Sequence, residues 1–200
     1  MKIALTGKMR SGKDTVACML TDDFTFTKVA FSDGIWETIK IVLPECLEAG
    51  VKPRGALVDV GQALREKFPT VWIDYTDREI RVLGDENVII TDCRQINEYE
   101  YLKKAGFTIV KVEALEHIRK ERMKEKGEII PDELFNNVTE RTVDMLKADY
   151  IIHNNSTYHN LLGEVKDFYK WYFLHHTPDI KYMKLLKERG LYADREVHDS

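Results

Sequence analysis

The segment from Gly7 to Thr15 carries two glycines, a lysine and a hydroxyl group at a spacing that suits phosphate chemistry. It follows an apolar run that begins at Lys2 and precedes a run of helix-forming residues. In such a loop the backbone N–H groups and the positive end of the following helix face a phosphate, and the lysine reaches the β- and γ-phosphates of a nucleotide. Gly7 permits the tight turn, and Gly12 lets the backbone approach the phosphate closely. The spacing therefore predicts a phosphate-binding loop (P-loop) whose binding residues are Gly7, Lys8, Arg10, Ser11, Gly12, Lys13, Asp14 and Thr15.

Asp14 departs from the plain P-loop pattern. Ser or Thr usually follows the lysine and holds Mg²⁺, whereas here the hydroxyl comes one place later, at Thr15. Two interpretations of Asp14 stay open: it binds the metal directly or through water, or its charge favours the helix N-terminus.

A second candidate site follows the apolar run at 87–91. Asp92 ends this predicted strand, where a carboxylate can hold Mg²⁺ through water or accept the proton of an attacking oxygen, the alternative role being a helix N-cap. Arg94 suits bidentate binding of a phosphate, the alternative being a surface salt bridge. Asp14, Thr15 and Asp92 are thus the candidate Mg²⁺ ligands.

Composition and charge narrow the class of protein. The 200 residues are 44% hydrophobic and 32% charged, which suits one domain with a sizeable core. A net charge of -4 argues against a large basic face for duplex nucleic acid. Cys18, Cys46 and Cys93 are odd in number and widely spaced, which indicates neither a disulfide framework nor a zinc site. The chain shows no leader pattern and no apolar run near the ~18 residues of a membrane span, so we expect a cytoplasmic protein without a membrane partner.

Hydrophobic periodicity predicts strands that alternate with helices. After the strand before Gly7, strands are expected at 26–31, 87–91, 107–112 and 150–152. Helices are expected at 13–20, 33–42, 54–68, 71–81, 98–105, 115–126, 131–146, 158–174 and 179–189. This alternation predicts an α/β fold: a parallel sheet of about five strands with helices on both faces, in three layers. Ligands bind at the carboxyl ends of such strands, so the loops after Leu5, Ala30, Ile90 and Ile152 should converge on one crevice.

Two motifs resemble the phage-type deoxynucleoside monophosphate kinases. Those enzymes carry Arg-Ser-Gly-Lys-Asp-Thr, as at 10–15, and an Asp-x-Arg-Gln similar to Asp92-Cys93-Arg94-Gln95. The likeness covers roughly residues 1–170, and the Ala-Asp-x-x-Ile-x-Asn strand at 148–154 is also similar to dephospho-coenzyme A kinases. The resemblance implies a P-loop NTPase fold with a helical lid. It also implies that ATP, with Mg²⁺, donates its γ-phosphoryl group to a (deoxy)nucleoside monophosphate.

The same resemblance implies roles for further residues. The helix at 115–126 would be a mobile lid on which Arg119 and Arg122, one turn apart, join Lys13 and Asp92 as catalytic residues; the alternative is a solvated helix of i,i+4 ion pairs. The loop at Asn154 would line the adenine. The residues that would frame the acceptor are Ser32, Asp33, Arg54, Gln62, Arg65, Trp72, Arg94 and Gln95, with Trp72 either stacking on a base or lying in the core.

The expected layout is a single domain over 1–200, with acceptor-binding helices at about 33–80, a lid at about 114–146 and a C-terminal helical extension at about 175–200. Two other functions stay open. A dephospho-coenzyme A kinase would use Asp92 as a true general base, because its acceptor is a hydroxyl. A nucleotide-binding switch would bind without transfer, but the Asn-Lys-x-Asp and Asp-x-x-Gly motifs of a guanine switch are missing from the sequence.

Overall fold

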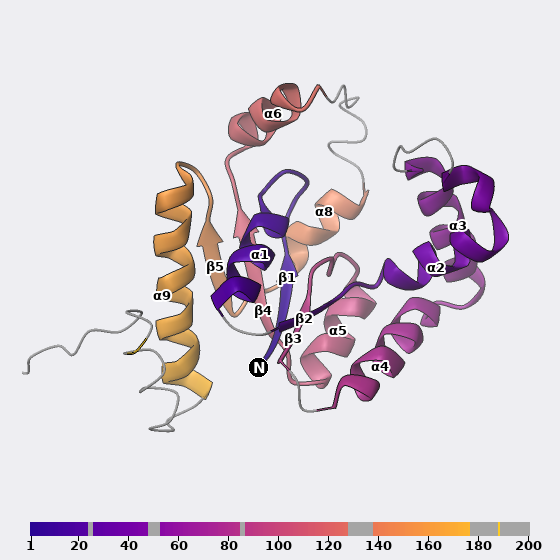
Figure 1. The fold of residues 1–200 in the computed structure, drawn as a ribbon, viewed down its shortest axis with the longest axis horizontal. Coiled ribbons are helices and arrows are strands. Elements are labelled where there is room, and N and C mark those ends of the chain that lie inside the picture. The colour runs from indigo at the N-terminus through magenta and orange to yellow at the C-terminus, as the bar shows by residue number, and fades with distance from the viewer. Residues whose placement is uncertain (24–25, 48–52, 85–86, 128–137, 177–187, 189–200) are drawn as a thin grey trace, which may run out of the picture.

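A five-stranded parallel sheet forms the centre of the molecule (Figure 1). The computed structural model describes all residues except 24–25, 48–52, 85–86, 128–137, 177–187 and 189–200. The strands are β1 (Lys2–Thr6), β2 (Phe26–Val29), β3 (Asn87–Ile90), β4 (Thr108–Glu113) and β5 (Tyr150–His153). They lie in the order β2-β3-β1-β4-β5, with every pair parallel. All five carboxyl ends therefore meet at one edge of the sheet, as the predicted α/β class requires.

Helices cover both faces of this sheet. They are α1 (Lys13–Asp23), α2 (Asp33–Val42), the 3₁₀ turn η1 (Pro44–Leu47), α3 (Arg54–Lys67), α4 (Val71–Leu83), α5 (Ile96–Lys104), α6 (Glu116–Glu125), α8 (Val138–Met145) and α9 (Tyr158–His176). Alternate strand residues point to opposite faces. Ile3 and Leu5 of β1 pack with α1 and α9 on one face, whereas Ala4 packs with α4 and α5 on the other.

A third apolar cluster lies among α2, α3 and α4, to one side of the sheet. Its buried members are Ile35, Ile39 and Trp72. Trp72 is only 4% exposed, and its indole N–H donates to the carbonyl oxygen of Gly61 at 3.0 Å. The core alternative therefore describes Trp72, and stacking on a base is not available to a ring buried in this way.

The predicted five strands are confirmed, with one changed boundary that bears on the site. β2 ends at Val29 rather than at Phe31. The reason is that the backbone N–H groups of the next three residues turn to carboxylates: Ala30 donates to Asp33, and Phe31 and Ser32 donate to Asp92. Of the helix expected at 131–146, α8 lies in the described part, whereas 131–137 and the helix expected at 179–189 lie outside the described residues except for Glu188.

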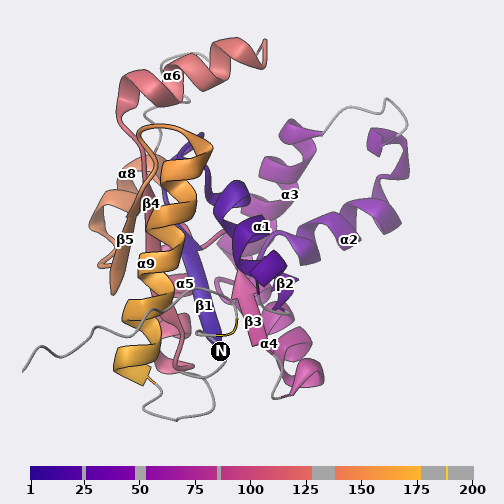
Figure 2. The same cartoon turned by 60° about the vertical axis from the view of Figure 1, so that its left-hand side comes forward.

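The carboxyl edge of the sheet carries the loop between β1 and α1. In both views this loop lies between α6 and the group of helices α2, α3 and α4, which we call the α2–α4 unit (Figure 2). Across the described part of the chain, each helix falls short of the length or apolar character that a bilayer crossing needs.

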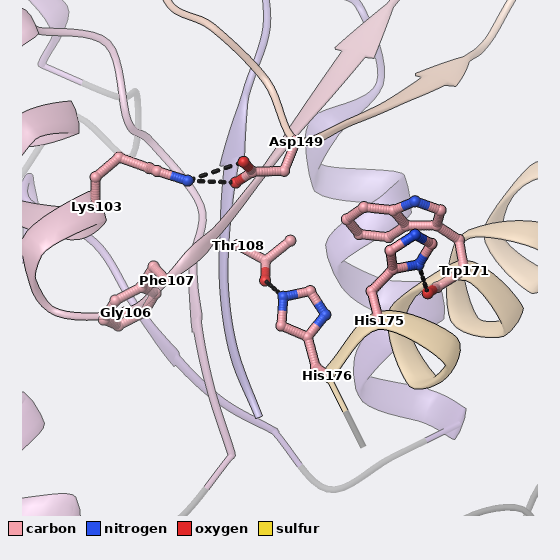
Figure 3. Close-up of a pocket in the computed structure, with 8 residues that line it drawn as sticks. All are labelled: Lys103, Gly106, Phe107, Thr108, Asp149, Trp171, His175 and His176. Atoms are coloured by element: carbon pink, nitrogen blue, oxygen red, sulfur yellow. Dashed lines mark hydrogen bonds and ion pairs between the residues drawn. The ribbon is translucent and has the colours of Figure 1, made fainter. Parts of the chain in front are cut away.

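A pocket of about 410 Å³ lies at the opposite, amino-terminal edge (Figure 3). It is lined by Lys103, Gly106, Phe107, Thr108, Asp149, Trp171, His175 and His176. Its polar groups contact one another: the ammonium of Lys103 lies 2.8 Å from a carboxylate oxygen of Asp149, and Thr108 Oγ1 lies 3.3 Å from His176 Nε2. The first contact joins α5 to the residue before β5, and the second joins α9 to the start of β4. Both belong to the edge opposite the P-loop.

Candidate phosphate-binding site

The segment between β1 and α1 has the backbone of a phosphate-binding loop. Gly7 and Gly12 have φ angles of +147° and +97°, which side chains rarely adopt. Arg10 at the tip also has a positive φ, of 62°. A Cβ on Gly7 would lie 2.4 Å from the carbonyl oxygen of Val112 in β4. The two glycines are thus needed both for the turn and for its close packing against the sheet.

Lys13 at the start of α1 is folded into this loop. Its ammonium donates to the carbonyl oxygens of Gly7 at 2.7 Å and Lys8 at 3.2 Å, and the residue is 7% exposed. Burial, and next the positive charge of Arg94, lower the pKa of Lys13 to about 8. The lysine therefore stays largely charged at neutral pH and lies where an incoming phosphate would compete with the loop carbonyls.

Two arginines of α6 bind the outer side of the same loop. Arg119 Nη1 donates to the carbonyl oxygen of Met9 at 3.2 Å. Arg122 Nη1 lies 3.2 Å and 3.4 Å from the carbonyl oxygens of Arg10 and Ser11. The predicted face of α6 is thus brought to the P-loop, with Arg119 buried at 4% exposure. The exposed side of α6 carries the Glu116–Lys120 pair at 2.7 Å, as the solvated-helix alternative expected.

Asn154, directly after β5, packs against Gly12. Its amide donates to the carbonyl oxygen of Ser11 at 2.9 Å, and its own oxygen accepts from Arg122 at 3.1 Å. A Cβ on Gly12 would lie 2.1 Å from Asn154 Nδ2. The structure therefore places Asn154 beside the P-loop, buried at 6% exposure. Its role toward adenine remains a prediction.

Asp92 follows β3 and faces the loop between β2 and α2. Its two carboxylate oxygens accept the backbone N–H groups of Phe31 at 2.9 Å and Ser32 at 3.0 Å. Asp33 holds the same loop through the N–H of Ala30 at 2.7 Å, and burial raises the pKa of Asp33. Asp92 therefore connects the end of β3 to the loop before α2 by hydrogen bonds, in addition to any role toward a ligand.

The remaining acceptor candidates divide into two groups. Arg65 of α3 reaches the sheet edge, where it lies 3.6 Å from Glu98 Oε1, and Glu98 Oε2 accepts the N–H groups of Arg94 and Gln95. Gln62, in contrast, is exposed and bonds Glu66 of its own helix at 3.2 Å. The side chain of Arg54 lies outside the described residues.

Sequence comparison places this loop in a known family. The model of that family, described as an AAA domain, matches residues 3–144, which include most of β1, the P-loop and most of α8. The chain belongs to this AAA domain family. No curated protein matches the sequence of the chain.

Solved structures share the fold of this AAA domain. TT1252 from Thermus thermophilus is 18% identical with a TM-score of 0.56, over 88% of this chain and 97% of that one. Shikimate kinase from Acinetobacter baumannii in complex with shikimate is 15% identical with the same TM-score, over 88% and 94%. At these identities the likeness concerns the fold, which is an α/β P-loop kinase-like fold.

The donor groups of the AAA domain fit a nucleotide phosphate with Mg²⁺. Ser11 Oγ is buried in the loop and has no hydrogen-bond partner within the described residues, so a phosphate oxygen would supply one. The oxygens of Asp14, Thr15 and Asp92 are of the kind Mg²⁺ prefers. Asp14 and Thr15 are exposed, and the described residues contain no cluster of three or more His, Cys, Asp or Glu that could hold a metal. The metal would accordingly be held mainly by nucleotide oxygens and water.

Two carboxylates of the site were not predicted. Glu140 of α8, buried at 2% exposure, accepts the N–H of Met9, and Glu98 braces Arg94 and Gln95. A signal for Glu140 was available: it lies three residues before Val143, on the helix face that Val143 buries. A carboxylate on an apolar helix face is a candidate for a buried role.

Proposed function

We propose that this AAA domain transfers the γ-phosphoryl group of Mg-ATP to a (deoxy)nucleoside monophosphate, giving the diphosphate and ADP. The observation that carries the proposal is a convergence of cations around the P-loop. Lys13 lies inside the loop, Arg119 binds its outer side, and Arg94 approaches from the end of β3. Phosphoryl transfer depends mainly on positioning and charge neutralisation, which such a set supplies.

Arg94 is the residue best placed to bind the acceptor phosphate. Its side chain is 34% exposed and lies 3.7 Å from Glu140, a distance longer than a good hydrogen bond. A partly exposed guanidinium that an ion pair orients, but that makes no close hydrogen bond there, keeps its donors for bidentate binding of an arriving phosphate. Arg65 of α3, which lies 3.6 Å from Glu98 of α5, is a second cation near Arg94 and supports an acceptor site on this side of the P-loop.

The hydrogen bonds that Asp92 already accepts favour a monophosphate as the acceptor over the hydroxyl group of dephospho-coenzyme A. A general base must reach the proton it abstracts, and both oxygens of Asp92 already accept backbone N–H groups. A monophosphate is anionic at neutral pH and needs charge shielding rather than a base.

An ADP-release assay with Mg-ATP and a panel of acceptors tests the proposal. The panel contains the deoxynucleoside and ribonucleoside monophosphates, dephospho-coenzyme A and, because of the structural neighbours, shikimate. We expect turnover with monophosphates, and Lys13→Ala should abolish it. Arg94→Ala should raise the KM of the monophosphate roughly 10- to 150-fold with the KM of ATP nearly unchanged, because a hydrogen bond to a charged group contributes about 1.5–3 kcal/mol.

Arg81→Ala is the matched control, because Arg81 is an exposed arginine of α4 paired only locally with Asp77 in the contacts described. Its kinetic constants should equal those of the unchanged protein. If the unchanged protein binds ATP but transfers phosphate to none of the acceptors, the kinase proposal is wrong and a nucleotide-binding switch becomes the better hypothesis.

A further inference from the structure

Glu140 is a buried carboxylate beneath the P-loop, outside every motif of the sequence. It lies in the first turn of α8 and is 2% exposed. Burying an ionised carboxylate carries a large desolvation cost unless charges and hydrogen bonds compensate it. Its contacts should therefore account for its presence.

Met9, Arg94 and Arg119 are among the groups that contact this carboxylate in the described part of the chain. The N–H of Met9 lies 3.0 Å from Oε1 and 2.9 Å from Oε2. Arg94 Nη1 lies 3.7 Å from Oε1, and Arg119 Nη1 lies 3.6 Å from Oε2. One oxygen thus faces the arginine from the end of β3, and the other faces the arginine from α6.

The geometry gives Glu140 a place between the two sides of the proposed reaction. Arg94 is on the acceptor side and Arg119 contacts the donor loop, where the same nitrogen that faces Glu140 also donates to the carbonyl oxygen of Met9. Without the carboxylate, the two guanidinium groups and the ammonium of Lys13 would lose a buried counter-charge that they share. Like charges in a buried site repel strongly, so Arg94 would move away from Arg119, which keeps its hydrogen bond to the carbonyl oxygen of Met9.

We propose that Glu140 is a positioning residue for phosphoryl transfer, which holds Arg94 and Arg119 as a pair against the P-loop. The proposal rests on the proposed kinase function. Glu140 does not touch the reacting atoms in this assignment; it acts through the two arginines. Its loss should consequently appear in kcat and in acceptor binding, while ATP binding changes little.

Glu140→Gln is the direct test, because the amide keeps the size and one acceptor for Met9 but has no charge. We expect kcat to fall at least tenfold, since small displacements of a positioned group reduce rates by up to ~100-fold. We also expect the KM of the acceptor to rise severalfold and the KM of ATP to stay within about twofold. Glu140→Asp keeps the charge and should give a kcat between those of the glutamine variant and the unchanged protein. Asp167→Asn, which removes a carboxylate from an exposed pair with Lys170 on α9, is the control and should change none of these constants.

A double-mutant cycle separates positioning from support of the fold. If Glu140 acts through Arg119, Glu140→Gln should cost less than threefold in kcat once Arg119 is alanine. The proposal would be overturned if Glu140→Gln reduced kcat equally with Arg119 and with alanine at position 119. It would also be overturned if kcat of Glu140→Asp were lower than kcat of Glu140→Gln. If Glu140→Gln fails to fold, the aspartate variant with and without Arg119→Ala carries the same comparison. Normal transfer by Glu140→Gln would overturn this proposal alone, whereas an unchanged protein that transfers to no acceptor would overturn the kinase function and this proposal with it.

Discussion

Gly12→Ala tests the close packing of the P-loop against the strand end that carries Asn154. The substitution adds one methyl group at a residue with a φ of +97°. That methyl carbon would lie 2.1 Å from Asn154 Nδ2, so one of the two residues must move. Asn154 cannot move without loss, because its amide donates to Ser11 and its oxygen accepts from Arg122.

The magnitude follows from two contributions. Holding alanine at this backbone conformation costs about 1–3 kcal/mol. Displacing Asn154 removes a buried hydrogen bond to Ser11, worth about 1 kcal/mol. We therefore expect the free energy of unfolding to fall by roughly 2–4 kcal/mol, which is a large share of the ~5–15 kcal/mol that stabilises a typical domain.

Gly106→Ala is the matched control. Gly106 has a φ of +79°, but a Cβ there meets nothing within 4 Å. The free energy of unfolding of Gly106→Ala should fall only by the cost of the backbone conformation, about 1–2 kcal/mol. Urea unfolding gives both stabilities, and titration with a fluorescent ATP analogue should show a loss of at least tenfold in affinity for Gly12→Ala only. Equal stabilities of the two variants, together with normal ATP binding by Gly12→Ala, would refute the packing of Asn154 against the loop.

Two further predictions concern Glu98 and the cysteines. Burial raises the pKa of Glu98 to about 7 from an ordinary value near 4.5, so the folded protein holds a proton that the unfolded chain has lost, and stability falls as pH rises from about 4.5 through 7. That rise in pKa corresponds to about 3 kcal/mol of stability lost on deprotonation. Urea unfolding at pH 5 and pH 8 should therefore show that the free energy of unfolding of Glu98→Gln, relative to the unchanged protein, increases by up to that amount at the higher pH. A difference between the two proteins that does not depend on pH would contradict this prediction. Cys93 is buried, and burial raises the pKa of its thiol, whereas Cys18 is exposed. A thiol reagent should thus label Cys18 in the folded protein and Cys93 only in denaturant. Cys18→Ala should remove the fast labelling of that thiol and leave the partly exposed Cys46 as the reactive site in the folded protein, and rapid labelling of Cys93 would contradict its burial.

The sheet was predictable because its strands are short apolar runs between helical patterns. Parallel strands covered on both faces must be apolar throughout, and the runs at 87–91 and 107–112 have that character. The P-loop was predictable for a related reason, because its two glycines meet a strict backbone requirement. Both features depend on residues that are near one another in the sequence.

The partners of the charged residues were not predictable in this way. Asp92 accepts N–H groups from residues about sixty positions earlier, and Glu140 bonds Met9 from 131 positions later. Such contacts depend on how the helices dock, which spacing along the chain does not specify. Trp72 shows the same limit, because one helical spacing fits both a core residue and a stacking surface, and only packing against α2 and α3 separates them.

The hydrogen bonds of α6 indicate how its two arginines act on the P-loop. Arg119 and Arg122 bind carbonyl oxygens on the outer side of the P-loop. A carbonyl that accepts a hydrogen bond from a cation polarises its peptide group, which makes the N–H of the same peptide a stronger donor. The two arginines can therefore strengthen phosphate binding through the loop itself, before either one touches a phosphoryl group. Each guanidinium has five N–H donors, so contact with the loop also leaves donors for a transferring phosphate. The position of α6 and the conformation of the P-loop are in consequence coupled. Removing the arginine contacts to the loop carbonyl oxygens should therefore weaken nucleotide binding, whereas Glu140→Gln leaves these contacts in place.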